Sequence, residues 1–493
     1  MSDHPLDPIF HPRAVAVVGV PSNPDAARMR GFYHSMLESG FPKRGGLYPI
    51  NPKVDKIGDA PCYATLLDAP DPVDHVISQV PAPAVPALVD QCIEKGVRSI
   101  HFFTAGFSET GDSDMAGMER TMVAKLKEAG IRVIGPNCMG LYVPSSRLAF
   151  MDGFPMESGS VFLLSQSGAN AGEIVHDLTG RGVRFSKVVS YGNGSDLRAH
   201  DFLDYAAADP ESKVVAAYVE GVQDGPAFFA ALKRCAAVKP VVILKGGRTS
   251  SGSHAAHSHT GSLAGSIEVF DAVCRQAGAL RAETMEDLLD LVIACSTNTR
   301  YVEGRGVALV GGGGGGFAVL SSDAIDRAGL NVPKLPPEAV AEMREYIPVA
   351  GSSVNNPIDA FPDGADVERM LNTVGRSDVI DTMFLSPQTD RSKWNRSIDQ
   401  PDADREMAEE AADLLVRTGT AIGKPVVGIL RSGRMARMMG VGPESFMVAC
   451  YKRGVGAYPS VTRAAHTVAQ ILEWRAGRDG LPDLFDTAME NRK

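Results

Sequence analysis

The sequence predicts an α/β protein built from parallel, doubly wound sheets. Short runs of β-branched residues, such as Val15–Gly19 and Val161–Leu164, alternate with segments whose apolar residues recur at helical spacing, as Val85, Leu88 and Val89 do. Strands that alternate with amphipathic helices indicate βαβ units, in which crossover helices cover a parallel sheet. The chain has 493 residues, which is enough for roughly three domains at about 150 residues each.

Each expected strand is a short apolar run, and helical patterns lie between the runs. In the second region each run ends in a Gly-, Ser- or Glu-containing turn. The first region (6–150) has Val15–Gly19, Leu47–Ile50, His75–Val80, Ser99–Phe103 and Arg132–Gly135; the second (155–300) has Val161–Leu164, Lys187–Ser190, Val214–Val219 and Val241–Leu244; the third (304–478) has Val307–Val310, Ile380–Leu385 and Val426–Leu430. The segment Lys239–Arg248 resembles Lys424–Arg434, since both contain KPVV and end in a Gly-Arg loop. This echo indicates that the second and third regions share one plan.

Composition excludes several classes of protein. The 59 acidic residues outnumber the 49 basic ones, and a net charge of -10 argues against a general nucleic-acid binder. The amino terminus does not resemble a signal peptide, and no apolar run reaches the ~18 residues that span a bilayer. The seven cysteines are scattered and contain no CxxC pair. We therefore expect a cytoplasmic protein with reduced thiols, no structural zinc site and no membrane partner.

Ligands of open parallel sheets bind at the carboxyl ends of the strands, so the loops there are the candidate sites. The first loop, Gly19–Asn23, lacks the GxGxxG fingerprint, which disfavours a nicotinamide dehydrogenase. Its backbone N–H groups and Ser22 could bind a phosphate, and a plain turn is equally consistent with the pattern. The loop Gly135–Gly140 contains Asn137 and Cys138. Because no His–acid pair accompanies Cys138, packing is favoured over a nucleophilic role.

The loop Ser165–Ala169 lies directly before an expected helix, Asn170–Thr179. Hydroxyls and unsatisfied N–H groups at a helix start form an anion site. Simple N-capping by Ser167 is the alternative. The anion site is favoured, because Ser165 would be superfluous as a cap.

A histidine-rich segment follows Lys245–Arg248 and contains His254, His257 and His259. No carboxylate or cysteine stands at ligand spacing, so a metal site is disfavoured. A solvated loop is one interpretation. The other is a nucleophilic imidazole at His259, since neutral imidazole attacks phosphorus and the Thr260–Ser262 turn precedes an amphipathic run.

Two further loops each have two possible roles. Glu220 ends the run Val214–Val219, where its carboxylate could fix the tautomer of a histidine ring or could be a solvated rim residue. The glycine run Gly311–Gly316 fits a phosphate cradle and fits a flexible loop equally well.

Taken together, eight motifs carry a family resemblance: VAVVGVPSNP near the start, YPINPK (48–53), GPNCMG (135–140), LLSQSGA (163–169), YVEG (218–221), KGGR (245–248), SHTGSLAG (258–265) and NNPIDA (355–360). In these motifs the chain resembles the large, alpha-type subunit of NDP-forming acyl-CoA synthetases, relatives of succinyl-CoA synthetase. The resemblance covers nearly the whole chain. It implies a CoA-binding Rossmann domain followed by two flavodoxin-like ligase domains.

The resemblance also implies roles for individual residues. It implies that His259 is a transient phosphohistidine and that Glu220 orients its ring. The implied phosphate-binding residues are Ser165, Ser167, Gly168, Thr260 and Gly261, and those implied to line the coenzyme A site are Gly19, Ser22, Pro49, Lys53, Asn137 and Cys138.

The implied reaction interconverts acyl-CoA, phosphate and NDP with the free acid, CoA and NTP, through an acyl phosphate and the phosphohistidine. No segment reads as an ATP-grasp domain, so we expect a beta-type ATP-grasp partner that binds ATP or ADP with Mg²⁺, in a hetero-oligomer such as α2β2. The alternative is a non-catalytic CoA or acyl-CoA sensor or scaffold, which is consistent with the missing nucleotide domain.

Overall fold

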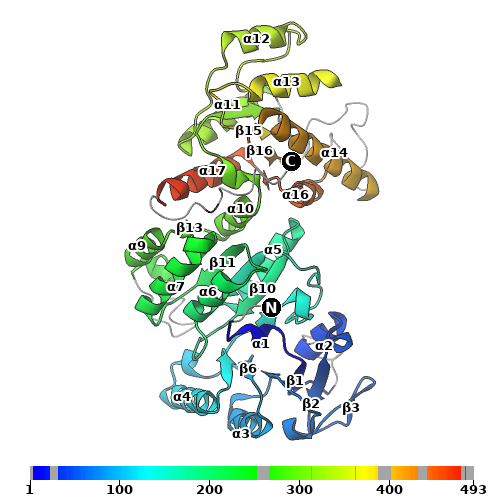
Figure 1. Cartoon of the computed structure of the whole chain (residues 1–493), viewed down its shortest axis with the longest axis vertical. Helices are drawn as coiled ribbons and strands as arrows, with labels where there is room; N and C mark the ends of the chain where they lie inside the picture. The colour runs from blue at the N-terminus through cyan, green and yellow to red at the C-terminus, as the bar shows by residue number, and fades with distance from the viewer. Residues whose placement is uncertain are drawn as a thin grey trace. The chain divides into compact units, whose positions relative to one another are not determined.

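Helices and strands alternate along the chain in the computed structural model, which confirms the α/β class (Figure 1). The structure describes residues 4–22, 31–252, 266–311, 314–360, 362, 364–386, 401–430, 441–478 and 484. Contacts divide the chain into two compact units, one of residues 1–177 and 184–288 and one of residues 178–183 and 289–493. The division into three domains stays a prediction.

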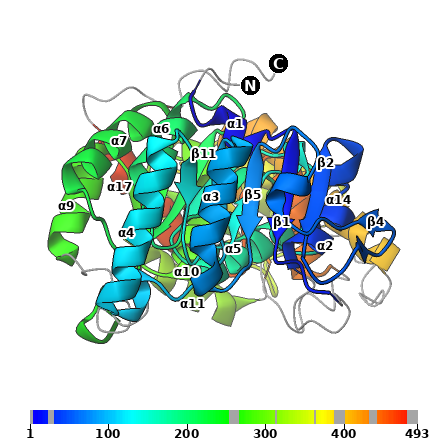
Figure 2. The ribbon, with the colours of Figure 1, turned by 90° about the horizontal axis from the view of Figure 1, so that it is seen from below.

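The first sheet of the first unit is parallel and has the strand order β2-β1-β5-β6-β7. Its elements are α1 (Asp7–Phe10), β1 (Ala14–Val18), α2 (Gly31–Glu38), β2 (Gly46–Ile50), β5 (His75–Ser78), α3 (Val85–Lys95), β6 (Ser99–Phe102), α4 (Ser113–Glu128) and β7 (Arg132–Ile134), with a small hairpin of β3 (Lys56–Ile57) and β4 (Ala60–Pro61). Every residue of β1, β5 and β6 is buried, as expected for strands covered on both faces. Figure 2 shows α3 and α4 crossing this sheet beside one another.

The second sheet has the order β13-β12-β11-β9-β10-β8. Its elements are β8 (Gly140–Tyr142), β9 (Val161–Ser165), α5 (Gly168–Gly180), β10 (Phe185–Ser190), α6 (Ala199–Ala208), β11 (Val214–Val219), α7 (Gly225–Val238), β12 (Val241–Lys245), α9 (Ile267–Ala277) and β13 (Leu280–Ala282). The chain moves outward from β9 to β10 and then crosses back to β11. Because crossovers between parallel strands are right-handed, α5 covers one face of the sheet, and α6 and α7 cover the other.

Strand β8 is one of the short strands that the sequence pattern missed. It lies within the range predicted for the first region, yet it pairs antiparallel with β10 in the second sheet. The chain therefore leaves β7 of one sheet and enters the next sheet after only a few residues. This connection places the loop between Gly135 and Gly140 against both sheets.

The second unit contains a parallel sheet with the order β14-β15-β16-β17. Its elements are α10 (Met285–Ser296), whose first turn belongs to the first unit, β14 (Val307–Val310), α11 (Gly315–Arg327), α12 (Pro337–Arg344), α13 (Ala365–Gly375), β15 (Thr382–Leu385), α14 (Pro401–Ile422), β16 (Val426–Ile429), α16 (Pro443–Lys452), β17 (Ala457–Tyr458) and α17 (Val461–Ala476). Strand β16 pairs with the edge strand β17 as β12 pairs with β13. This matches the shared plan that the repeated KPVV segments indicate.

Candidate active site

The loops that follow β9, β11 and β12 meet at the carboxyl edge of the second sheet. In the strand register, Tyr218 pairs with Ser165 of β9 and Val219 pairs with Lys245 of β12. Gln166 makes the last backbone bond between β9 and β11, to the carbonyl of Tyr218, and Glu220 lies just beyond it. The strand order reverses between β9 and β11, and this is the position where doubly wound sheets bind their ligands.

Glu220 is buried at this edge, with 7% of its surface exposed, so it is not the solvated rim residue that the sequence allowed. Its Oε1 accepts a hydrogen bond of 3.2 Å from the hydroxyl of Tyr218. Its Oε2 is buried and has no partner among the described residues. A buried carboxylate oxygen without a donor is costly, so Oε2 is a vacant acceptor for an incoming N–H group.

The main chain of Glu220 is held by two side chains. Oε1 of Gln166 accepts from the backbone N–H groups of Glu220 and Gly221, at 2.8 and 3.0 Å. Nζ of Lys245 donates to the carbonyl oxygen of Glu220 at 2.6 Å. The sequence analysis assigned no role to Gln166 or Lys245, although they lie in the motifs LLSQSGA and KGGR. The reason is that their hydrogen-bond partner, the backbone of Glu220, belongs to a different strand end.

The Ser165–Gly168 loop makes hydrogen bonds within itself. The Ser165 hydroxyl is buried and donates to the carbonyl of Ser167 at 2.7 Å. Oγ of Ser167 accepts from the backbone N–H of Asn170 at 3.3 Å, in the first turn of α5. Ser167 thus has the capping contact that the sequence offered as the alternative, and anion binding by this loop stays a prediction. A Cβ at Gly168 would lie 2.7 Å from Cγ of Met139, so a glycine is needed where the 135–140 loop meets the start of α5.

His259, Thr260 and Gly261 lie outside the described residues, as do His254 and His257. Before them, the structure describes β12 and the residues that follow it up to 252. After them, it describes the N-cap Ser266 and α9.

The carboxyl ends of β1 and β2 bring four residues of the predicted coenzyme A site together. Gly19 has a φ of +90° and donates its N–H to Ile50, while Pro49 is buried within β2. Nδ2 of Asn51 donates to Oγ of Ser22 at 3.2 Å, and Oδ1 of Asn51 accepts from the backbone N–H of Lys53. The sequence motif contained Asn51, but only the structure shows that it joins the two loops.

The surface at these strand ends fits a phosphate-bearing ligand. The Lys53 and Ser22 side chains are both exposed there. No carboxylate among the described residues forms an ion pair with Lys53. Lysine ammonium and serine hydroxyl groups are side-chain types that bind phosphate, and coenzyme A binding at these loops stays a prediction.

Asn137 and Cys138 lie at the opposite edge of the first sheet, after β7. Asn137 has a φ of +58° and donates its N–H to Thr104. The Cys138 thiol is buried and donates to the carbonyl of Phe102, and burial raises its pKa above the usual thiol value. A protonated, enclosed thiol is a poor nucleophile, which agrees with the packing role favoured by the sequence. A Cβ at Gly192 would lie 2.3 Å from the carbonyl oxygens of Pro136 and Asn137.

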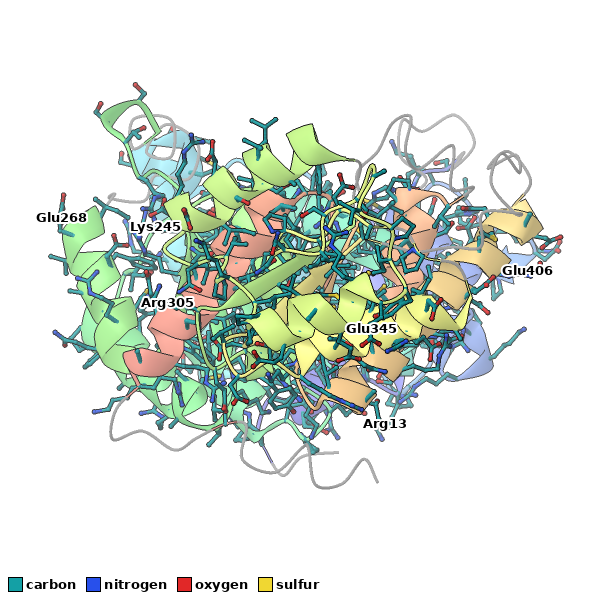
Figure 3. All side chains as sticks on the ribbon, turned by 90° about the horizontal axis from the view of Figure 1, so that it is seen from above. Arg13, Lys245, Glu268, Arg305, Glu345 and Glu406 are labelled. Carbon is teal, nitrogen blue, oxygen red and sulfur yellow. The ribbon has the colours of Figure 1, made fainter. Side chains whose placement is uncertain are left out.

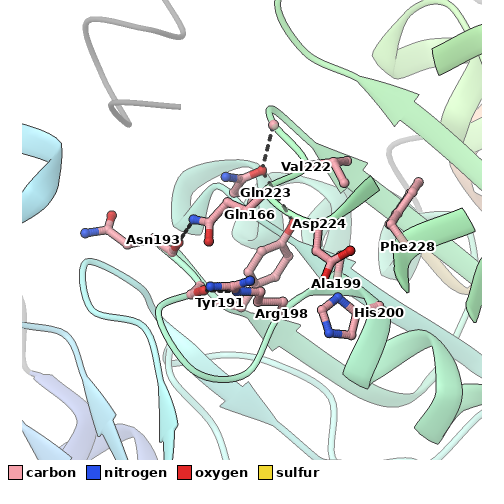
Figure 4. A pocket seen from close by; sticks show the side chains of 12 residues that line it. Gln166, Tyr191, Asn193, Arg198, Ala199, His200, Val222, Gln223, Asp224 and Phe228 are labelled. Carbon is pink, nitrogen blue, oxygen red and sulfur yellow. Dashed lines mark hydrogen bonds between the residues drawn. The ribbon is translucent and has the colours of Figure 1, made fainter. Parts of the chain in front are cut away.

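A small pocket opens on the side of the second sheet that α6 and α7 cover (Figure 4). Gln166 lines it, and Gln166 is also the residue that binds the backbone of Glu220. The other lining residues are Tyr191, Asn193, Gly194, Arg198, Ala199, His200, Gly221, Val222, Gln223, Asp224 and Phe228. The Nε2 group of Gln223 donates to the carbonyl of Asn193 across this pocket (Figure 4).

One group of potential metal ligands occurs within the described part of the chain, and it lies away from these strand ends. The donor atoms of His34, Glu38 and Asp152 lie within 4.8 Å of one another. His34 is hydrogen-bonded to Glu38, and the Ser35 hydroxyl donates to Asp152. These contacts account for the cluster without an ion. Among the described helices, none is both long and apolar enough to cross a membrane.

Three family models match the chain in the order of its sheets. A CoA binding domain matches residues 13–144, a succinyl-CoA ligase like flavodoxin domain matches residues 158–295, and a ligase-CoA domain matches residues 307–471. Fold and matched domains together define the class: a CoA-binding Rossmann-like domain followed by succinyl-CoA ligase-like domains.

Known proteins narrow this class to a family. The chain is 35% identical over 381 residues to the alpha subunit of acetate–CoA ligase [ADP-forming] II of Pyrococcus furiosus, covering 77% of this chain and 81% of that protein. It therefore belongs to the family of ADP-forming acetate–CoA ligase alpha subunits. It is also 36% identical over 372 residues to acetate–CoA ligase [ADP-forming] I of Archaeoglobus fulgidus, covering 75% of this chain but 52% of that protein. The chain thus spans about half the length of such relatives.

A solved structure is similar over almost the whole chain. The dinucleotide forming acetyl-coenzyme A synthetase 1 of Candidatus Korarchaeum cryptofilum, in complex with phosphate and ADP, has a TM-score of 0.77 and 29% sequence identity. The similarity covers 96% of this chain and 97% of that chain.

Proposed function

We propose that this chain is the coenzyme A-binding and phosphohistidine-bearing subunit of an ADP-forming acid–CoA ligase. The reaction interconverts acyl-CoA, phosphate and ADP with the free acid, CoA and ATP. The observation that carries the proposal is the buried Glu220 carboxylate, whose vacant Oε2 lies at the strand ends of the ligase-like sheet.

The chemistry divides into three transfers. A phosphate oxygen attacks the thioester carbonyl, the C–S bond breaks, and the thiol of CoA leaves as an acyl phosphate forms. A ring nitrogen of His259 then attacks phosphorus, the bond between phosphorus and the acyl oxygen breaks, and the carboxylate is released. The terminal oxygen of ADP finally takes the phosphoryl group from His259, which regenerates the imidazole.

Glu220 prepares the imidazole for the second transfer. Its Oε2 accepts a hydrogen bond from one ring N–H of His259, which fixes the tautomer and leaves the other nitrogen free to attack. The Ser165–Gly168 loop, with Thr260 and Gly261 from the histidine segment, binds the phosphoryl group. The N-terminal end of α5 supports this role, because helix N-termini stabilise anions.

Coenzyme A binds as a substrate at the carboxyl ends of the first sheet. The Lys53 ammonium pairs with its phosphates, and Gly19, Ser22 and Pro49 shape the loop beside it. Asn137 and Cys138 lie at the opposite edge of the sheet, in the loop that reaches the second sheet. There they contribute backbone and shape rather than a reactive thiol.

We further propose that an ATP-grasp subunit of beta type supplies the nucleotide site and Mg²⁺, in a hetero-oligomer such as α2β2. The alpha-subunit name of the Pyrococcus relative supports a partner subunit. All seven cysteines are free thiols, which supports a reducing, cytoplasmic location.

The test is phosphoryl transfer to His259. The chain is incubated with an ATP-grasp subunit of the family, γ-labelled ATP and Mg²⁺, and then with acid and CoA. We expect acid-labile phosphate on the protein, its loss on addition of acid and CoA, and no label on His259→Asn. Label that persists in His259→Asn would refute this nucleophile. Binding of CoA without any phosphohistidine would support the sensor or scaffold instead.

A further inference from the structure

The peptide of Glu220 is held at both of its polar groups by buried side chains from the two neighbouring strand ends. Gln166 follows β9 and accepts from the N–H, whereas Lys245 ends β12 and donates to the carbonyl. Gln166 is 6% exposed and Lys245 is 3% exposed. Lys245, the last residue of β12, is labelled in Figure 3.

These side chains take the place of main-chain ladder bonds. The last backbone bonds around the end of β11 are those from Gln166 to Tyr218 and from Gly246 to Val219. Glu220 is the first residue beyond them, so its N–H and carbonyl have no strand partner. The peptide is buried, and buried peptide groups without partners are rare because each costs free energy.

Using the Lys245 ammonium to bind the Glu220 carbonyl costs free energy, because a cation must be buried. Its ammonium is buried and has no ion pair among the described residues. It donates to two carbonyl oxygens, those of Glu220 and Gly246. Burial lowers the pKa of Lys245 from its usual value, while the nearby Glu220 raises it. A neutral residue would pack at the end of β12 without the cost of desolvating a cation. The burial of Lys245 at this position therefore indicates that the carbonyl oxygen of Glu220 requires a hydrogen-bond donor.

We propose that Gln166 and Lys245 are positioning residues that fix the Glu220 carboxylate for the active-site imidazole, which rests on the proposed function. With N–H and carbonyl held, the Cα of Glu220 cannot shift, and Tyr218 then holds one carboxylate oxygen. Oε2 is left as the oxygen that meets the ring. Small displacements of a catalytic group cost large factors in rate, so loosening the peptide should slow phosphorylation of His259 while coenzyme A still binds.

The first test removes each contact with a side chain of similar size. In the complex with an ATP-grasp subunit, Gln166→Met and Lys245→Met are each expected to slow phosphorylation of His259 at least tenfold. The Kd for coenzyme A should stay within twofold of the wild-type value. A phosphorylation rate within twofold of wild type in a folded variant would overturn the proposal.

Two matched controls separate positioning from general stability. Nζ of Lys239 is also half-buried and donates to backbone carbonyls, those of Ala206 and Asp209, but it lies before β12 at the other end of that strand. Oε1 of Gln91, on α3, accepts from the backbone N–H of Leu66. Lys239→Met and Gln91→Met are expected to lower the melting temperature and to leave the phosphorylation rate within twofold. An equal slowing in these variants would overturn the assignment.

A double-mutant cycle shows whether the two residues act through Glu220. In the Glu220→Gln background, Gln166→Met and Lys245→Met should each change the residual phosphorylation rate by less than threefold, because the carboxylate they position is gone. A full tenfold effect in that background would overturn positioning. If Gln166→Met does not fold, Lys245→Met makes the same test from the other side of the peptide.

The outcome also separates this inference from the proposed function. If the wild-type chain acquires no phosphohistidine with its partner and ATP, the proposed function fails. If the wild-type chain is phosphorylated and both methionine variants are phosphorylated equally fast, the proposed function stands and the positioning roles are wrong.

Discussion

The hydroxyl of Tyr218 and the carboxylate of Glu220 are joined by a hydrogen bond of 3.2 Å between two residues on the same side of one strand end. Neither side chain lines the pocket that Gln166 lines. The bond commits Oε1 of Glu220, whereas Oε2 has no partner among the described residues. It therefore decides which carboxylate oxygen is available to a ligand.

Replacing Tyr218 with phenylalanine should release that oxygen. A hydrogen bond to a charged group is worth about 1.5–3 kcal/mol, and about 1.4 kcal/mol corresponds to a tenfold change. We expect Tyr218→Phe to slow phosphorylation of His259 roughly tenfold, measured with labelled ATP and an ATP-grasp subunit. Tyr205→Phe is the control, because Tyr205 also donates to a carboxylate, that of Asp7. Equal rates for the two variants would contradict a special role for Tyr218.

Lys53 should contribute charge to coenzyme A binding. Lys53→Met is expected to raise the Kd for coenzyme A about tenfold at low salt, with a smaller difference at high salt because exposed charges are screened. Isothermal titration calorimetry measures both values. Lys56→Met removes a second exposed lysine from the adjacent hairpin, and its Kd should stay near that of the wild type. If both variants weaken binding equally, the effect reflects net charge and not a site.

The Cys138 thiol should resist alkylation in the folded protein. Burial raises the pKa of Cys138, and its surroundings leave no path for a reagent. Cys62 is only partly buried, so we expect iodoacetamide to modify Cys62 first and Cys138 only after unfolding in urea. Mass spectrometry of the peptides distinguishes the two. Modification of Cys138 at the rate of Cys62 in native protein is the result that this explanation does not allow.

Two buried histidines should make the protein sensitive to acid. Desolvation lowers the pKa of His75 to about 3 and that of His101 to about 4. Because both folded values lie below the value of about 6.5 expected in the unfolded chain, the unfolded state binds more protons below that pH. The stability is fully present above about pH 6.5 and falls as the pH drops towards the folded values, by up to about 1.4 kcal/mol per pH unit for each histidine.

Urea unfolding at pH 7, 6 and 5 measures this slope. His75→Gln should reduce the slope attributed to the pair by about half. His176→Gln, at a histidine whose side chain is 87% exposed, should leave it unchanged. A wild-type free energy of unfolding that is flat between pH 7 and 5 would contradict the linkage.

The sequence predicted strands correctly where the strand is fully buried, because a fully buried strand has an unbroken run of apolar residues. The runs at β1, β9 and β14 are strands because parallel strands are covered on both faces and need an unbroken apolar sequence. The expected strand Ile380–Leu385 begins only at Thr382, because Ile380 packs into the core from the preceding turn. Strand β8 was missed since three residues with a leading glycine carry no periodicity, and its partner β10 is distant in the chain.

By itself, the sequence determined the fold class and the motifs at the strand ends, because alternating apolar runs and turn residues act over a few neighbouring positions. Only the tertiary structure decided that Glu220 is buried and that Gln166 and Lys245 hold its backbone between them. Those contacts join residues between 25 and 54 positions apart, and they exist only because parallel pairing brings three strand ends to the same edge.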